Sequence, residues 1–133
     1  MPPFERRSVV DAMCLGVVTC PPDATLREVA RVMATYRIHS VVVTETVDGK
    51  PVGVIADIDV AAAAASSRDA PAGSLARSEP TTVHPDDSLE HAAQLMAEHE
   101  VTHLVVVQPH TCQPIGILSA LDVAGALAWD GLA

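Results

Sequence analysis

Two residues in the second half of the chain, Ser119 and Asp122, have types and spacing that could do chemistry. They stand in GILSALDVA, where an apolar strand-like run passes into a helix-like run. A serine followed three residues later by an acid can form a capping box at a helix N-terminus. A carboxylate beside the partial positive charge of that terminus can also accept hydrogen bonds from both hydroxyls of a ribose. Ser119 and Asp122 are therefore candidates both for a helix cap and for ligand binding.

The same turn occurs earlier in the chain as GVIADIDVA, with one informative change. Asp59 keeps the position of the acid, but Ala56 stands where the other turn has a serine. The hydroxyl that would cap the helix and contact a ligand is missing, and Asp57 becomes the candidate for the cap. We expect the Asp122 site to be the stronger of the two.

The two turns belong to an internal repeat. They lie 63 residues apart, and this offset aligns the preceding region without a gap. The matched pairs include Thr19 and Thr82, Pro22 and Pro85, Asp23 and Asp86, Leu26 and Leu89, Met33 and Met96, and Gly53 and Gly116. A single offset over such a length indicates a duplicated unit, because chance matches would not hold one register.

Each copy predicts the element order βαββα. Apolar residues at helical spacing indicate the helices, and runs of β-branched residues indicate the strands. The expected helices cover residues 25–36, 57–66, 88–99 and 120–128, and the expected strands cover 17–19, 40–45, 51–56, 81–83, 103–108 and 114–118. The strands are almost continuously apolar, which predicts burial on both faces. We expect an α/β (α+β) fold in which two repeats, 8–66 and 75–128, pack as a pseudo-two-fold pair with sheets inside and helices outside, joined by a linker at 67–74.

Composition and charge exclude several classes of partner. Phe4, Tyr36 and Trp129 are the only aromatic residues, and the formal charge is −9, so stacking on and attraction to nucleic acid are both disfavoured. The charge is uneven, because residues 1–66 carry six cations and eight acids while residues 67–133 carry two and nine. Three scattered cysteines, no signal-like N-terminus and no apolar run of about 18 residues favour a cytoplasmic protein without a membrane span.

By these motifs the chain resembles a known family. The stretch VVTCPPDATLREVARVMATYRIHSVVV, followed by GKPVGVIADIDV, is similar to a cystathionine-β-synthase (CBS) domain, and the second copy is similar to another. The resemblance covers residues 8–128 and identifies a tandem CBS pair, or Bateman module. It implies a regulatory module, not an enzyme, with no resident cofactor. The implied ligand contains adenosine and binds in two clefts between the copies; AMP is the first choice, and ADP, ATP and S-adenosylmethionine belong to the same class.

The resemblance also implies the residues that line each cleft. One cleft would be formed by Ser119 and Asp122 with Thr19, His39 and Ser40, and with Val18 and Val41 as walls for adenine. The other would be formed by Asp59 with Thr82, Thr102 and His103, and with Val83 and Leu104 as walls. Histidines stand where the family often has Arg or Lys, and neutral imidazoles disfavour strong triphosphate binding.

Assembly and rival functions complete these expectations. The helices at 57–66 and 120–128 carry small side chains that permit close approach, which predicts a homodimer through them and the helices at 25–36 and 88–99. The alternative function is a ligand-free dimerising module that docks onto a partner protein, which Ala56 and the few cations of the clefts favour. A zinc site at His110 and Cys112 matches no strong spacing motif. No catalytic, channel or DNA-binding domain is recognised, so the regulated protein is not identified.

Overall fold

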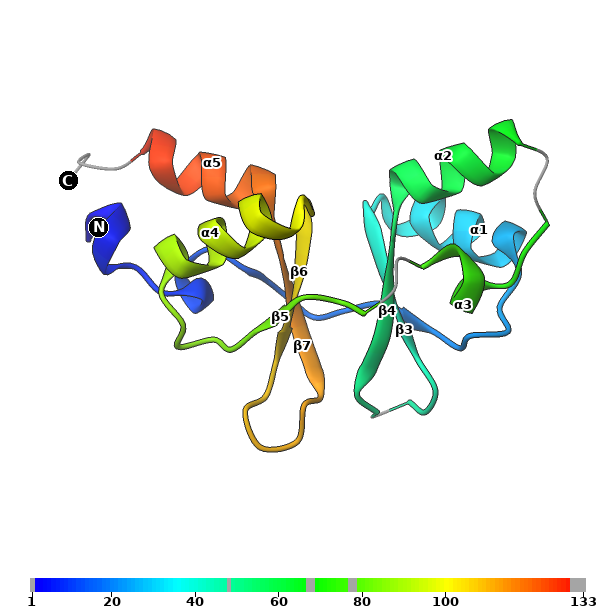
Figure 1. Ribbon diagram of the computed structural model, residues 1–133, viewed down its shortest axis with the longest axis horizontal. Coiled ribbons are helices and arrows are strands. Elements are labelled where there is room, and N and C mark those ends of the chain that lie inside the picture. Colours follow the sequence, from blue (N-terminus) through cyan, green and yellow to red (C-terminus); the bar gives the residue numbers. More distant parts are fainter. Residues whose placement is uncertain (1, 48, 67–68, 77–78, 130–133) are drawn as a thin grey trace. The chain divides into compact units, whose positions relative to one another are not determined.

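The structure, a computed structural model, describes residues 2–47, 49–66, 69–76 and 79–129 (Figure 1). The chain divides into two compact units. Unit 1 comprises Met1–Gly16 and Thr81–Ala133, and unit 2 comprises Val17–Pro80. None of the helices in the described ranges is long and apolar enough to cross a membrane.

Unit 2 contains a three-stranded sheet with helices packed on it. Its elements are β2 (Thr19–Cys20), α1 (Leu26–Tyr36), β3 (Ser40–Thr44), β4 (Pro51–Ala56), α2 (Asp57–Ala65) and α3 (Ala72–Leu75). The strand order is β2-β3-β4, with β2 parallel and β4 antiparallel to β3. Val29 and Met33 of α1 pack on Val41 and Ile55 of the sheet, so the apolar stripe of the helix forms the core.

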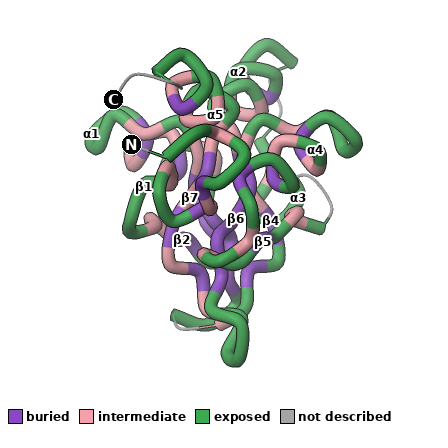
Figure 2. Tube along the Cα trace, turned by 90° about the vertical axis from the view of Figure 1, so that its left-hand side faces the viewer, coloured by how far each residue is buried: buried purple, intermediate pink, exposed green. Residues whose placement is uncertain are grey.

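Unit 1 repeats this arrangement and adds one strand. Its elements are η1 (Phe4–Arg6), η2 (Val9–Asp11), β1 (Cys14–Leu15), β5 (Thr82–Val83), α4 (Leu89–His99), β6 (His103–Val107), β7 (Pro114–Ser119) and α5 (Ala120–Ala128). The strand order is β1-β7-β6-β5. Leu89 and Met96 of α4 pack on Leu104 and Leu118 of the sheet. Buried residues concentrate in the strands and on one face of each long helix (Figure 2).

The mixed α/β class and the βαββα order are confirmed, and the 63-residue offset extends to the pairing of strands. Thr19 lies opposite Val42 in one sheet, and Thr82 lies opposite Val105 in the other. The caps repeat as well, because the side chains of Thr25 and Ser88 accept from the backbone of α1 and α4. The packing of the two repeats as a pseudo-two-fold pair stays a prediction.

The segment that leads into each repeat packs with the body of the other repeat. The backbone N–H of Val9 donates to Asp87 at 2.8 Å, and β1 pairs with β7, so the start of the first repeat belongs to unit 1. Sixty-three residues later, the N–H of Ala72 donates to Ala24 at 2.8 Å in unit 2. The expected linker at 67–74 therefore includes the start of α3, whose Ala72 and Leu75 are buried in the core of unit 2.

Candidate functional site

The end of β7 and the start of α5 form a complete capping box. The Ser119 hydroxyl oxygen accepts from the Asp122 N–H at 3.1 Å, and Asp122 Oδ2 accepts from the Ser119 N–H at 2.8 Å. The box satisfies two N–H groups and fixes the half-buried carboxylate at the positive end of the helix. Within the described residues, Asp122 Oδ1 has no hydrogen-bond partner. The Oδ2 atom therefore has a structural role.

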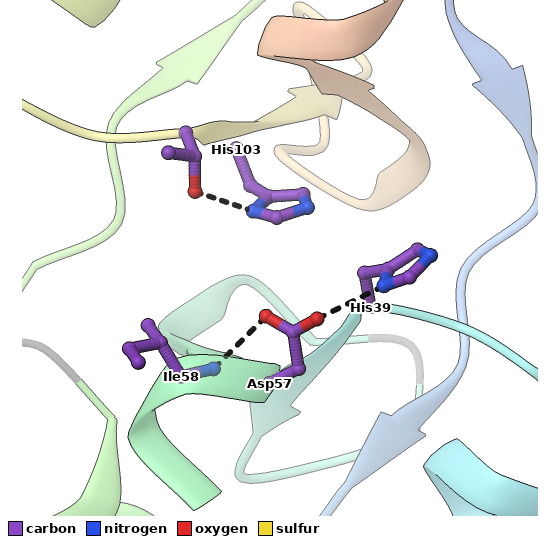
Figure 3. A network of polar contacts seen from close by, with 5 residues as sticks. His39, Asp57, Ile58 and His103 are labelled. Carbon is purple, nitrogen blue, oxygen red and sulfur yellow. Dashed lines mark hydrogen bonds and ion pairs between the residues drawn. The ribbon is translucent and has the colours of Figure 1, made fainter. Parts of the chain in front are cut away.

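Two neighbouring strands bring further polar groups to the start of α5. His103 of β6 lies opposite Ser119, and the Thr102 carbonyl accepts from the Ala120 N–H at 2.8 Å. The Thr102 hydroxyl lies 2.9 Å from His103 Nδ1. Figure 3 marks the contact at His103 with a dashed line. The sequence assigned Thr102 and His103 to the cleft of Asp59; within unit 1 they lie at the same sheet end as Ser119.

Cys14 is a neighbour of this site that the sequence did not indicate. It lies on β1 opposite Ile117 of β7. Burial, and then the negative charge of Asp122, raise the pKa of the Cys14 thiol above its ordinary value of 9.0. The spacing of Cys14 from Asp122 along the chain gives no sign of this proximity, because the pairing of β1 with β7 creates it.

The start of α2 is built differently. Asp59 Oδ2 accepts from the Ala56 N–H at 2.8 Å, but Ala56, the N-cap, has no hydroxyl to return the bond. Asp57 is the first residue of the helix and not its N-cap; its Oδ1 accepts from the Ile58 N–H at 2.9 Å. The box at this turn is half-formed, and the expectation that its site is the weaker one stays a prediction.

Asp57 also makes an ion pair that the sequence did not reveal. Its Oδ2 lies 2.9 Å from His39 Nδ1 (Figure 3), and its N–H donates to the His39 carbonyl at 2.9 Å. Both side chains are exposed. In the second repeat the equivalent positions hold Thr102 and Ala120, which cannot form such a pair. His39 therefore has a partner within its own repeat.

The remaining predicted residues lie in or beside the sheets. Ser40 lies opposite Ala56 at the start of α2, Thr19 is half-buried on β2, and Thr82 is exposed on β5. Of the predicted apolar walls, Val41, Val83 and Leu104 are at most 2% exposed and belong to the cores of their own units. The fourth, Val18, accepts from the Val42 N–H at 3.0 Å and is half-buried. Packing accounts for these hydrophobes, and their contact with a ligand stays a prediction.

The residues predicted for each cleft are divided between the two units. Ser119 and Asp122 lie in unit 1, while Thr19, His39 and Ser40, predicted for the same cleft, lie in unit 2. That grouping, and the grouping of Asp59 with Thr82, Thr102 and His103, stay predictions. Within the described parts of the chain, no three His, Cys, Asp or Glu side chains gather as a metal site would require.

Each of the two βαββα repeats ends in a helix whose third residue is an aspartate, Asp59 in α2 and Asp122 in α5. The family model of the CBS domain matches residues 9–66 and again residues 72–128. The chain belongs to the CBS-domain family, as the sequence motifs predicted.

Two curated proteins illustrate the family. The chain is similar to the CBS domain-containing protein YhcV of Bacillus subtilis, with 32% identity over 120 residues that cover 88% of this chain and 83% of that protein. It is also similar to a homoserine O-acetyltransferase of Methanohalophilus mahii, with 31% identity over 124 residues. That match covers 93% of this chain but only 25% of the enzyme.

Solved structures share the fold and include ligand complexes. A CBS domain protein, PAE2072 from Pyrobaculum aerophilum, complexed with AMP, has a TM-score of 0.78 and 30% identity, covering 92% of this chain and 98% of that one. CBSX2 in complex with AMP has a TM-score of 0.72 and 25% identity, covering 91% and 96%. The CBS domain pair of protein MJ0100, in complex with 5′-methylthioadenosine and S-adenosyl-L-methionine, has a TM-score of 0.83. Its identity of 21% supports the fold alone, over 92% of this chain and 96% of that one.

Proposed function

We propose that this chain is a regulatory module that binds an adenosine-containing ligand, with AMP as the first choice, through Asp122 at the start of α5. The observation that carries the proposal is the Asp122 carboxylate, which the capping box holds in place through Oδ2 while Oδ1 lacks a protein partner in the described residues. An ionised carboxylate fixed in this way can accept from the hydroxyls of a ribose without ordering its own side chain first. The AMP complexes of PAE2072 and CBSX2 support the ligand class.

The start of α2 is the weaker candidate for a ligand. It lacks the hydroxyl that Ser119 supplies to the other turn, and a missing hydrogen bond costs about 0.5–1.5 kcal/mol. We propose that ligand occupies the Asp122 site first and the Asp59 site later or not at all.

Isothermal titration calorimetry with AMP tests this assignment through Asp122→Asn. The amide oxygen can still accept from the Ser119 N–H, so the cap is kept while the charge is lost. We expect the tighter binding event to weaken at least about tenfold, because charge-assisted hydrogen bonds are roughly twice as strong as neutral ones. Asp59→Asn is the matched control and should leave that event nearly unchanged. The reverse pattern would show that the working site lies in the other repeat.

We further propose that the module acts as a homodimer in the cytoplasm and signals by a conformational change to a protein not identified here. The free cysteines Cys14, Cys20 and Cys112 suit a reducing compartment. Ile58 on α2 and Leu121 on α5 are exposed at equivalent positions among small side chains, which favours helix-to-helix contact. Light scattering at tens of micromolar protein should give twice the chain mass; a monomer mass contradicts the dimer without bearing on AMP binding.

A further inference from the structure

The outer surface of α1 and α2 in unit 2 is hollow. A groove of about 470 Å³ is lined by Ala30, Val60 and Ala64, with Arg27 at its edge. It continues through Ala30 and Val60 into a second hollow of about 780 Å³, which Arg37 borders. We call this surface the alanine groove. Its lining is largely apolar, and its polar lining residues are Arg27, Arg37, His39, Asp57 and Asp69.

The equivalent surface in unit 1 carries larger side chains. Sixty-three residues after Ala64 and Ser66 of the first repeat, the second repeat has Leu127 and Trp129. Leu127 is 59% exposed and Trp129 is 64% exposed, so both stand clear of their own unit. Burial of such large apolar side chains against a partner is favourable. The two helical surfaces of the chain thus differ in shape, one hollow and one with bulky side chains.

The two surfaces also differ in charge at the same positions. Arg27 of α1 corresponds to Glu90 of α4, and Arg37 corresponds to Glu100. Arg37 and Glu100 share a left-handed backbone with φ of 53° at the ends of their helices, so each projects from the same point of its unit. All four side chains are exposed. The whole units follow this trend, because unit 1 has two cations and nine acids while unit 2 has six and eight.

We propose that the alanine groove of one copy receives the α4–α5 surface of unit 1 from a second copy, with Leu127 and Trp129 entering the groove. Contact between two identical surfaces would bring together two surfaces that both carry Arg27 and Arg37, or two that both carry Glu90 and Glu100. Contact between unlike surfaces sets arginine against glutamate and large side chains against alanines. The inference rests on the proposed homodimer and specifies its orientation.

Cross-linking between two marked copies tests the orientation. In a background in which the exposed Cys14 and Cys112 are replaced by serine, one copy carries Ala64→Cys and the other carries Leu127→Cys. With a short bismaleimide, we expect a covalent dimer when the two proteins are mixed and almost none when either is treated alone. Self-linking of Ala64→Cys or of Leu127→Cys would show contact between identical surfaces and would overturn the proposal.

The mass of the untreated protein separates the two claims. A dimer mass without the mixed cross-link overturns the orientation alone. A monomer mass overturns the orientation and the dimer together, while AMP binding at Asp122 is measured independently by calorimetry. Trp129, the only tryptophan, gives a second readout, because its emission should move to longer wavelength as dilution separates the copies.

Charge reversal tests the same contact without cysteines. Arg27→Glu with Arg37→Glu should weaken association at least about tenfold, and so should Glu90→Arg with Glu100→Arg. All four changes in one chain should restore the affinity to within about threefold, because arginine again meets glutamate. Lys50→Glu, which makes the same charge change on the exposed turn between β3 and β4, is the matched control for Arg37→Glu. Equal affinity for the double and quadruple variants would overturn the proposal.

Discussion

The Cys20 thiol on β2 is held in its neutral form by its surroundings. Burial, and then the negative charge of Glu28, raise its pKa from 9.0 to about 11. Between these values the unfolded chain ionises at Cys20 while the folded chain keeps the proton. The Cys20 thiol therefore makes its full contribution to the free energy of unfolding below pH 9.0, and this contribution is lost as the pH rises towards 11.

Urea unfolding of the natural chain and of Cys20→Ala measures this effect. From pH 8 to pH 10 the free energy of unfolding of the natural chain should fall by about 1.4 kcal/mol more than that of the variant, since one pKa unit corresponds to about 1.4 kcal/mol. Any packing lost in the variant is the same at both pH values and cancels. Parallel pH profiles for the two proteins would contradict the burial of this thiol.

At the scale of elements, the first turns of α2 and α5 allow a direct comparison of a helix whose N-cap has no hydroxyl with one whose N-cap has a hydroxyl. Ser119 has φ −101° and ψ 161°, and Ala56 has φ −92° and ψ 162°, so the two backbones are almost the same. Ser119→Ala should lower the free energy of unfolding by about 1 kcal/mol, and Ala56→Ser should raise it by a similar amount. Chemical denaturation of both variants checks the pair. Failure of Ala56→Ser to stabilise would mean that Asp57 already meets the need for a cap.

Two glycines of unit 1 differ in the space around them. A Cβ at Gly116 on β7 would lie 2.6 Å from the Cys14 carbonyl oxygen, whereas a Cβ at Gly125 on α5 would meet no atom within 4 Å. Gly116→Ala should therefore push β1 off the sheet and cost about 2 kcal/mol or more. Gly125→Ala should stabilise the helix by up to about 1 kcal/mol. Urea unfolding distinguishes them, and a harmless Gly116→Ala would show that β1 is dispensable.

At the scale of the whole molecule, ligand binding should appear as stabilisation. AMP at about a hundred times its dissociation constant should add about 2.7 kcal/mol to the free energy of unfolding. A thermal-shift screen of AMP, ADP, ATP, NAD and S-adenosylmethionine measures this, and Asp122→Asn should reduce the stabilisation at the same ligand concentration to about 1.4 kcal/mol or less, because binding is at least about tenfold weaker. Absence of a shift with every ligand would favour the alternative function, a module that docks onto a partner protein.

The sequence by itself determined the local structure and its duplication. Helical spacing in α1 and α4, the caps Thr25 and Ser88, and the β-branched strands are local signals, because each depends on neighbours a few residues away. The 63-residue offset then related the elements of one repeat to those of the other, including the capping box at Ser119 and its incomplete counterpart at Ala56.

Only the tertiary structure decided which distant residues meet. The ion pair of His39 with Asp57, the approach of Cys14 to Asp122, and the docking of Val9 and Ala72 on the opposite repeats all join segments that strand pairing and core packing bring together. Such contacts leave no periodic pattern in the sequence, because the partners lie far apart along the chain. The hollow beside Ala64 and the exposure of Leu127 also depend on the tertiary structure. The sequence fixes the size of a side chain, but its neighbours in the fold decide whether it is buried.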